Sequence, residues 1–169
     1  FLPLLTLEFA EPPQIRKEFI PQNGAMILGM SAGEIREGKT DVTTDQEIID
    51  EAAVAHKVAA HAHLDRDGSI CDWNNTVDSV AWDVEFPEAG SYEISLITQT
   101  RWAQQPWDGG RLMEVEWNSR RLASTLEKDR DFSTFHRKQY ESRLGVLTVR
   151  AGERGALILR TLRIDSKAA

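Results

Sequence analysis

The sequence predicts an all-β protein built as an antiparallel β-sandwich. Apolar residues alternate with polar or small ones before and after a turn at residues 87–90, which is the period-2 pattern of half-buried strands. Beyond Leu64, every apolar run is of strand length and is bounded by Gly, Pro, Asn or Asp. The alternating residues are Val80, Trp82, Val84, Phe86, Tyr92, Ile94 and Leu96. We expect the two strands around this turn to form a hairpin of the sandwich.

Length and composition fit one soluble domain, or one domain with a tail. On folding, a chain of 169 residues buries roughly 70% of the surface that its unfolded chain exposes. A hydrophobic core of this size needs no disulfides or metal ions to stabilise it. Its hydrophobic fraction of 41% is ordinary, and it contains no apolar run near the roughly 20 residues of a membrane helix. The net charge of -7 argues against a nucleic-acid partner, because phosphate binding depends on clustered Lys and Arg. We therefore expect neither a nucleic-acid nor a membrane partner.

The single cysteine, Cys71, cannot form an internal disulfide. This is compatible with the cytosol and equally with a bacterial periplasmic or surface protein. The chain starts at Phe1 without Met and has no signal peptide. We expect it to be a processed or excised C-terminal piece.

The first residues predict one separate strand. Leu5, Leu7 and Phe9 alternate with polar or small residues before the break at Pro12 and Pro13. Such a strand should dock on a preceding domain or on the edge of the sandwich. We expect residues 1–20 to be a strand and linker that end a preceding domain, and residues 21–169 to be the β-sandwich module.

The middle of the chain allows two interpretations. Within residues 43–63, four apolar residues lie at helical spacing after a possible cap at Thr44, whereas residues 58–65 alternate as a strand does. We expect a strand from Ala52 to Leu64, because a sandwich needs one here. The other predicted strands cover residues 27–30, 110–117, 121–125, 145–152 and 157–164.

The region from Cys71 to Leu96 also resembles a known family. It contains Trp73-x-Asn-x-x-Asp-x-Val-x-Trp82 followed by Ala89-Gly-x-Tyr-x-Ile94. This motif resembles the galactose-binding-like, jelly-roll carbohydrate-binding modules, most closely the module appended to the C-terminus of bacterial alpha-L-fucosidases. The likeness extends from about Ala25 to the end, and residues 4–13 resemble the last strand of the fold that precedes such modules.

The resemblance implies a non-catalytic jelly roll that is secreted or periplasmic in a bacterium. Its partners would be a fucose- or galactose-containing glycan and a glycosidase catalytic domain, which it would position on that glycan. A purely structural module that packs on a glycosidase without binding sugar is the alternative.

The five tryptophans divide into two groups. Trp82 and Trp117 fall in alternating strand patterns and are expected in the core. The other three lie in polar segments containing Gly or Pro, beside planar polar side chains of the kind that bond sugar hydroxyls. The candidate sugar-binding residues are Arg101, Trp102, Gln105, Trp107 and Asp108, with Trp73 and Asn75 on a second loop. The competing interpretation is that these indoles close the ends of the sandwich.

Metal sites have weaker support. In a strand, His61 and His63 would project to one face as two zinc ligands must, with His56 nearby, but no known catalytic spacing accompanies them. Asp65 and Asp67 resemble half of a calcium loop without its closing Glu, and an Asp-Gly hairpin turn explains them equally well. We expect no cofactor, with a structural calcium at these aspartates as the weak exception.

No catalytic motif stands out. Glycoside hydrolysis needs two carboxyl groups flanking the bond, and no pair of acids occupies a recognisable strand-end position. The Gly-x-Ser-x-Gly sequence of serine hydrolases is absent. We expect an accessory module without activity of its own, and rank an independent enzyme behind both non-catalytic functions.

Overall fold

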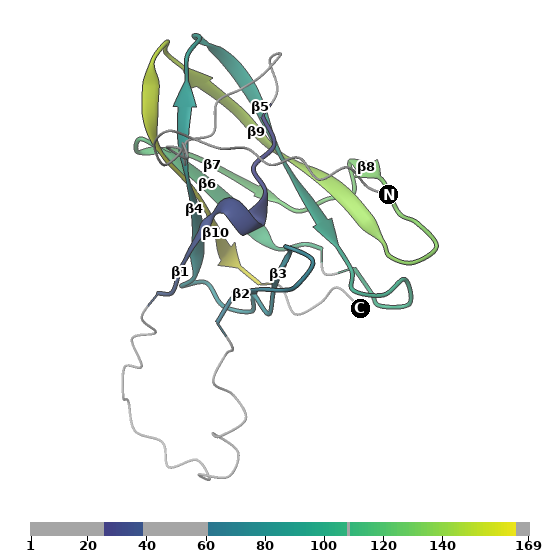
Figure 1. Cartoon of the computed structure of the whole chain (residues 1–169). Helices are drawn as coiled ribbons and strands as arrows, with labels where there is room; N and C mark the ends of the chain where they lie inside the picture. The colour runs from purple at the N-terminus through teal and green to yellow at the C-terminus, as the bar shows by residue number, and fades with distance from the viewer. Residues whose placement is uncertain (1–25, 39–60, 108, 165–169) are drawn as a thin grey trace, which may run out of the picture.

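The computed structural model describes residues 26–38, 61–107 and 109–164, and in them it forms two facing antiparallel sheets (Figure 1). The larger sheet has the strand order β1-β4-β10-β6-β7, the smaller has β5-β9-β8, and β2 pairs with β3 as a separate ribbon. No helix in these ranges is long and apolar enough to cross a membrane. The elements are a 3-10 helix η1 (Met30–Ala32), β1 (Glu34–Arg36), β2 (His63–Leu64), β3 (Ile70–Cys71), β4 (Ser79–Phe86), β5 (Gly90–Gln99), β6 (Leu112–Trp117), β7 (Arg120–Thr125), β8 (Arg130–Asp131), β9 (Gln139–Val149) and β10 (Glu153–Arg163).

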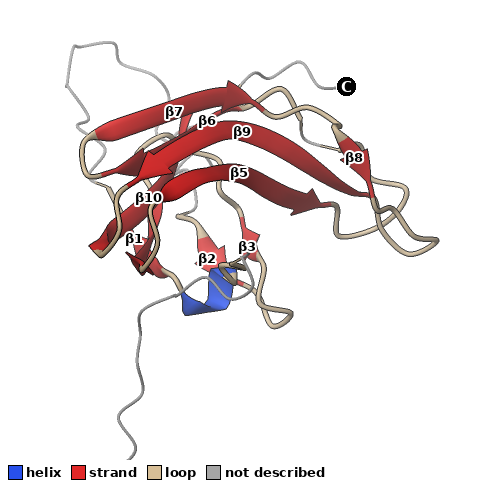
Figure 2. Cartoon of the chain, turned by 90° about the horizontal axis from the view of Figure 1, so that it is seen from above, coloured by secondary structure: helices blue, strands red, loops and turns tan. Residues whose placement is uncertain are grey.

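The core lies between the two sheets, which face each other as layers in Figure 2. Its largest fully buried side chain is Trp117, and Trp82 is nearly as buried, which confirms both as core residues. Phe86 packs its ring against Trp117 at 5.1 Å and against Tyr92 of the opposite sheet at 4.7 Å. Each such aromatic pair contributes about 0.5–1.5 kcal/mol beyond the area it buries. The predicted all-β antiparallel sandwich is therefore confirmed, whereas the jelly-roll connectivity stays a prediction.

The predicted hairpin between residues 79 and 96 is wrong. β4 pairs with β1 and β10, and β5 pairs with β9, so the two strands belong to different sheets. The turn after Phe86 carries the chain across the sandwich, and the buried faces of β4 and β5 then meet through the core. Alternation identifies which face of a strand is buried, but it does not identify the strand that bonds its edges.

A bulge in β9 changes which residues of that strand face the core. Residues 140, 142 and 144 are buried, then the alternation shifts to 147 and 149. The register against β5 shifts at the same place, between Ile94 and Ser95. Gly145 sits at the shift with φ +142°, a backbone conformation that residues with a Cβ rarely adopt.

The predicted first strand at residues 27–30 is also wrong. Residues 26–29 have no regular structure and lead into η1, and Ile27 is 89% exposed. The segment still packs on the core through Met26, Leu28 and Met30. The strand that pairs with the edge of β4 is instead β1, opposite Ser79–Ala81.

Several expectations lie outside the described residues. These are the strand at residues 1–11 and its linker, most of the segment from Ala52 to Leu64, and His56. Of the expected strand ending at Leu64, residues 61–64 are described; His63 and Leu64 form β2, whereas residues 61 and 62 are not in a strand. The later strands were predicted more accurately, since β6, β7 and β10 overlap the strands expected at residues 110–117, 121–125 and 157–164. β10 lies at the centre of the larger sheet, between β4 and β6.

Candidate functional site

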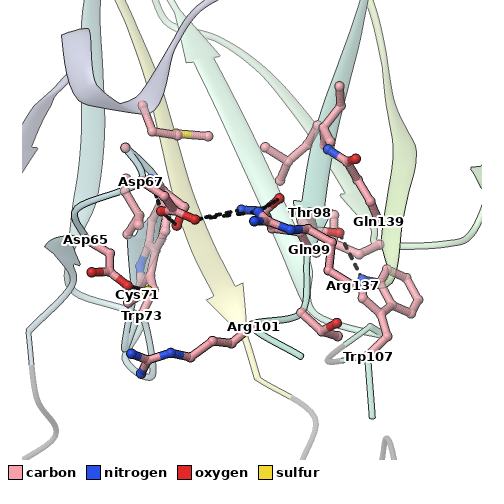
Figure 3. A pocket seen from close by; sticks show the side chains of 18 of the residues that line it. Asp65, Asp67, Cys71, Trp73, Thr98, Gln99, Arg101, Trp107, Arg137 and Gln139 are labelled. Atoms are coloured by element: carbon pink, nitrogen blue, oxygen red, sulfur yellow. Dashed lines mark hydrogen bonds and ion pairs between the residues drawn. The ribbon is translucent and has the colours of Figure 1, made fainter. Parts of the chain in front are cut away.

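A cavity of about 700 Å³ opens where the β2–β3 turn, the end of β5 and the loop at residues 100–107 meet (Figure 3). Its volume lies within the usual range of about 300–1,000 Å³ for small-molecule sites. Trp73, Trp102 and Trp107 all line it, so the structure brings the three candidate indoles to one place. Its apolar lining includes Met30, Leu96, Met113, Leu126 and Leu159.

Trp107 is a fixed wall of this cavity. Its Nε1 donates a hydrogen bond to Thr98 Oγ1 at 2.9 Å, and its ring meets Tyr140 edge-on at 4.9 Å. Lys128 Nζ lies 5.4 Å from the same ring. A Cβ at position 109 would overlap this ring, so the chain needs Gly109 there. The ring is held by neighbours on several sides.

Trp102, in contrast, is 60% exposed. Its ring contact within the described residues is with the Arg101 guanidinium, 6.0 Å from the ring centroid. The backbone beneath it is fixed by Gln105, whose Oε1 accepts from the N–H groups of Arg101 at 3.1 Å and Trp102 at 3.2 Å. Lys138 Nζ also donates to the Gln105 carbonyl at 2.9 Å. Trp102 therefore presents a solvent-exposed aromatic ring on a loop whose backbone is fixed by hydrogen bonds.

Gln105 itself does not line the cavity, although we expected it to bind ligand. Its side-chain oxygen is occupied by the loop backbone, so its position explains the shape of the loop. Asp108 lies outside the described residues. Of the predicted loop, the cavity is lined by Arg101, Trp102 and Trp107.

One side of the cavity carries a polar bridge that the sequence did not reveal. Arg137 donates from one guanidinium nitrogen to Gln99 Oε1 at 2.9 Å, and the same nitrogen lies 3.6 Å from Asp67 Oδ2. Gln99 Nε2 donates to the same carboxylate at 3.4 Å (Figure 3). The Ser69 hydroxyl, followed by the Ser69 backbone N–H and Arg137, holds the pKa of Asp67 below its usual value. Asp67 is thus a stable anion bound to the end of β5 through Gln99 and to the β8–β9 loop through Arg137.

Trp73 lines the cavity beside Asp65 and Cys71 (Figure 3). Arg111 donates to its carbonyl and, at 3.2 Å, to Asn74 Oδ1, and burial lowers the pKa of Arg111. The Trp73 indole Nε1 is buried and has no hydrogen-bond partner within the described part of the chain. A buried donor without an acceptor costs about 1–3 kcal/mol.

Asn75 does not line this cavity. It is buried, its Nδ2 donates to Asp78 Oδ2 at 2.7 Å, and its Oδ1 accepts from the Asp78 N–H at 2.8 Å. Asn75 therefore organises the entry to β4, and the structure does not place it with the other candidate residues.

The weak metal candidates form a turn and two ion pairs. Asp65 and Asp67 stand in the β2–β3 turn, where the Asp65 carbonyl accepts from Gly68 N–H at 3.0 Å. His61 Nδ1 lies 2.9 Å from Asp78, and His63 Nδ1 lies 3.7 Å from Asp72. Within the described ranges, no group of three or more His, Cys, Asp or Glu side chains is arranged to hold a metal ion.

No family model matches the sequence, and no curated protein matches it. Among solved structures, the chain is similar to part of an alpha-L-fucosidase from Vibrio sp. strain EJY3, with a TM-score of 0.44 and 14% sequence identity. The similarity covers 64% of this chain and 21% of that chain, so this chain matches about one fifth of that enzyme. A similarity this distant carries no argument about function.

Proposed function

We propose that this chain is a non-catalytic carbohydrate-binding module and that its sugar binds in the cavity. One observation carries the proposal: three indoles and several planar polar groups line a single cavity of suitable size. A pyranose has an apolar C–H face and a rim of hydroxyls, so it needs an aromatic surface beside hydrogen-bonding groups. Gln99, Gln139 and Arg137 supply such groups around the indoles.

Trp102 is the stacking surface in this proposal. Its ring is 60% exposed, whereas Trp107 is held by Thr98, Tyr140 and Lys128. An exposed ring on a loop pinned by Gln105 can accept a ligand without first losing internal contacts. Trp107 and Trp73 then form walls that limit the orientation of the sugar.

The lining favours binding over hydrolysis. Its carboxyl groups come from Asp65 and Asp67, and both belong to the β2–β3 turn. The pKa of Asp67 is lowered by hydrogen bonds from Ser69, whereas the general acid of a glycosidase needs a raised pKa. The cavity therefore lacks a suitable proton donor at Asp67.

We further propose that the chain serves as the accessory module of a glycosidase, with an alpha-L-fucosidase as the first candidate and a fucose- or galactose-containing glycan as the ligand. The resemblance of residues 73–94 to the modules of bacterial alpha-L-fucosidases supports this context. It also supports a secreted or periplasmic location in a bacterium.

A glycan-array screen followed by calorimetric titration of the hits tests the binding function. Millimolar affinity corresponds to only about 4 kcal/mol, so a contact worth about 1.4 kcal/mol changes the affinity tenfold. We expect Trp102→Ala to weaken binding at least tenfold while the protein stays folded. Phe135→Ala is the matched control, because Phe135 is 91% exposed and does not line the cavity.

Equal affinity of the parent protein and Trp102→Ala would exclude the assigned stacking surface. If the parent binds no mono- or oligosaccharide, including fucose and galactose, the purely structural accessory module becomes the better explanation.

A further inference from the structure

The cavity has a local excess of positive charge in an acidic protein. The whole chain carries a net charge of -7. The charged residues of the cavity lining are Arg66, Arg101, Arg111, Arg137, Asp65 and Asp67. Four arginines therefore face two aspartates around a space that we assign to a sugar.

Both aspartates are already engaged by the protein. Asp65 Oδ1 accepts from the Arg66 N–H at 2.6 Å. Asp67 Oδ1 accepts from the Ser69 N–H at 3.0 Å and from its hydroxyl, and Oδ2 faces Gln99 and Arg137. The negative groups of the lining thus maintain the β2–β3 turn and its link to β5.

Arg101 differs from the two arginines at the cavity wall. Arg137 is bound to Asp67 and Gln99, and Arg111 is bound to Trp73 and Asn74. The Arg101 side chain forms no ion pair with any residue in the described ranges, and the residue is exposed. Its guanidinium lies 6.0 Å from the Trp102 ring centroid, and Figure 3 shows it extended toward the side of the cavity that carries Asp65 and Trp73.

We propose that the cavity binds a sugar residue that carries an acid group, with the pyranose on Trp102 and the acid on Arg101. This inference rests on the proposed function and specifies its ligand class. A guanidinium presents a planar fork of donors that matches a carboxylate or a sulfate, and such charge-assisted bonds are about twice as strong as neutral ones. The distance between Arg101 and Trp102 suits one ring that contacts both. Carboxylate and sulfate share this chemistry, and the test separates them.

The test is calorimetric titration of the full chain with methyl β-galactoside, methyl galacturonoside and galactose 6-sulfate. We expect at least one acidic sugar to bind about tenfold or more tightly than the neutral one, and the advantage to shrink at high salt because screening weakens exposed charge pairs. An advantage limited to the galacturonoside identifies a carboxylate site, and one limited to the 6-sulfate identifies a sulfate site.

Two variants with the same charge change locate the effect. Arg101→Gln should remove the advantage of the acidic sugar, measured within that variant as the ratio of the dissociation constants of the neutral and the acidic sugar. Arg130→Gln should retain the advantage, because Arg130 on β8 pairs with Glu141 on β9 and does not line the cavity.

The possible failures are distinguishable. Equal affinity for neutral and acidic sugars would overturn this inference and leave the proposed function standing. An acidic-sugar advantage that survives in Arg101→Gln would overturn the role of Arg101. Absence of binding to all three sugars and to the glycan array would overturn both the inference and the proposed function.

Discussion

Asp78 shows how much one residue organises before the first long strand. Its side chain is fully buried and accepts from the N–H groups of Gly38 at 3.2 Å and Ala62 at 2.7 Å, from Asn75 Nδ2 at 2.7 Å, and from His61 at 2.9 Å. These bonds hold three separate stretches of chain at the start of β4. The aspartate of the Trp73–Trp82 motif is therefore a structural residue.

The same bonds predict acid sensitivity. Burial raises the pKa of Asp78, but the hydrogen bonds from Asn75, Ala62, His61 and Gly38 outweigh it and lower the pKa from 3.8 to about 2. A lowered pKa in the folded state stabilises the protein above the unfolded value, and this stability is lost as the pH falls from about 4 toward 2. Urea denaturation across this range should show the loss in the parent, and a flatter profile in Asp78→Asn.

Removing the carboxylate should also destabilise the protein at neutral pH. Asp78→Ala leaves buried N–H donors without an acceptor, so we expect a loss of about 3 kcal/mol or more in the free energy of unfolding. The loss is measured as a lower urea midpoint at unchanged slope. A change below about 0.5 kcal/mol would show that water replaces the carboxylate without cost.

His61 predicts the opposite pH dependence at the same site. Its hydrogen bond to Asp78 raises its pKa above 6.5 despite the opposing effect of desolvation, and the charges of Asp78 and Glu37 add to the increase. A raised pKa gives stability that is present below 6.5 and is lost as the pH rises through the folded-state value. Thermal unfolding at about pH 5.5 and about pH 8 should show this loss in the parent and in His63→Ala, but not in His61→Ala. Identical pH profiles for the parent and His61→Ala would contradict the assignment.

The strands show which parts of the fold could be predicted from sequence. β4 and the β6–β7 pair were predicted because their apolar alternation is uninterrupted. The first half of β9 was missed because the bulge at Gly145 shifts the alternation, so the pattern seemed to begin there. The partners of β4 and β5 could not be predicted, since sheet pairing depends on contacts far apart in the sequence.

Some residues of the candidate site could likewise be predicted from the sequence, and others could not. Trp102 and Trp107 could be found because indoles without strand alternation stand out in a polar loop. Gln99 and Arg137 could not, because neither belongs to a motif and only folding brings them to Asp67. Asn75 gave a misleading signal, since side-chain amides that organise a turn have the same sequence appearance as those that bind sugar.

The bulge in β9 supplies a prediction for that strand. Gly145 has φ +142°, so a side chain there strains the backbone even though Leu122, at 3.6 Å from the added Cβ, leaves ordinary van der Waals space. We expect Gly145→Ala to cost about 1–3 kcal/mol in the free energy of unfolding. Gly90→Ala is the control, because Gly90 begins β5 and its added Cβ meets Tyr92 at an ordinary 3.6 Å. Equal stability of the two variants would mean that the bulge relaxes to accept a side chain.

At the scale of the whole molecule, the described residues already supply both faces of a closed sandwich. The core cluster draws on β4, β5, β6, β9 and β10, and the cavity is lined from the same framework. The stability of the module should therefore depend on this framework. The division into residues 1–20 and 21–169 stays a prediction that follows from the break at Pro12 and Pro13.

Deleting residues 1–11 tests that division directly. We expect the melting temperature to change by less than about 2 °C, because the loss of a strand outside the sandwich should cost under about 0.5 kcal/mol, and 1 kcal/mol shifts a domain of this size by about 2–4 °C. Trp117→Ala calibrates the measurement, since truncating this fully buried side chain should cost about 3–5 kcal/mol and lower the melting temperature by roughly 10 °C. A deletion that lowers the melting temperature as much as Trp117→Ala would place residues 1–11 within the cooperative sandwich. The module would then begin at the first strand of the sequence, and the boundary at residue 20 would be wrong.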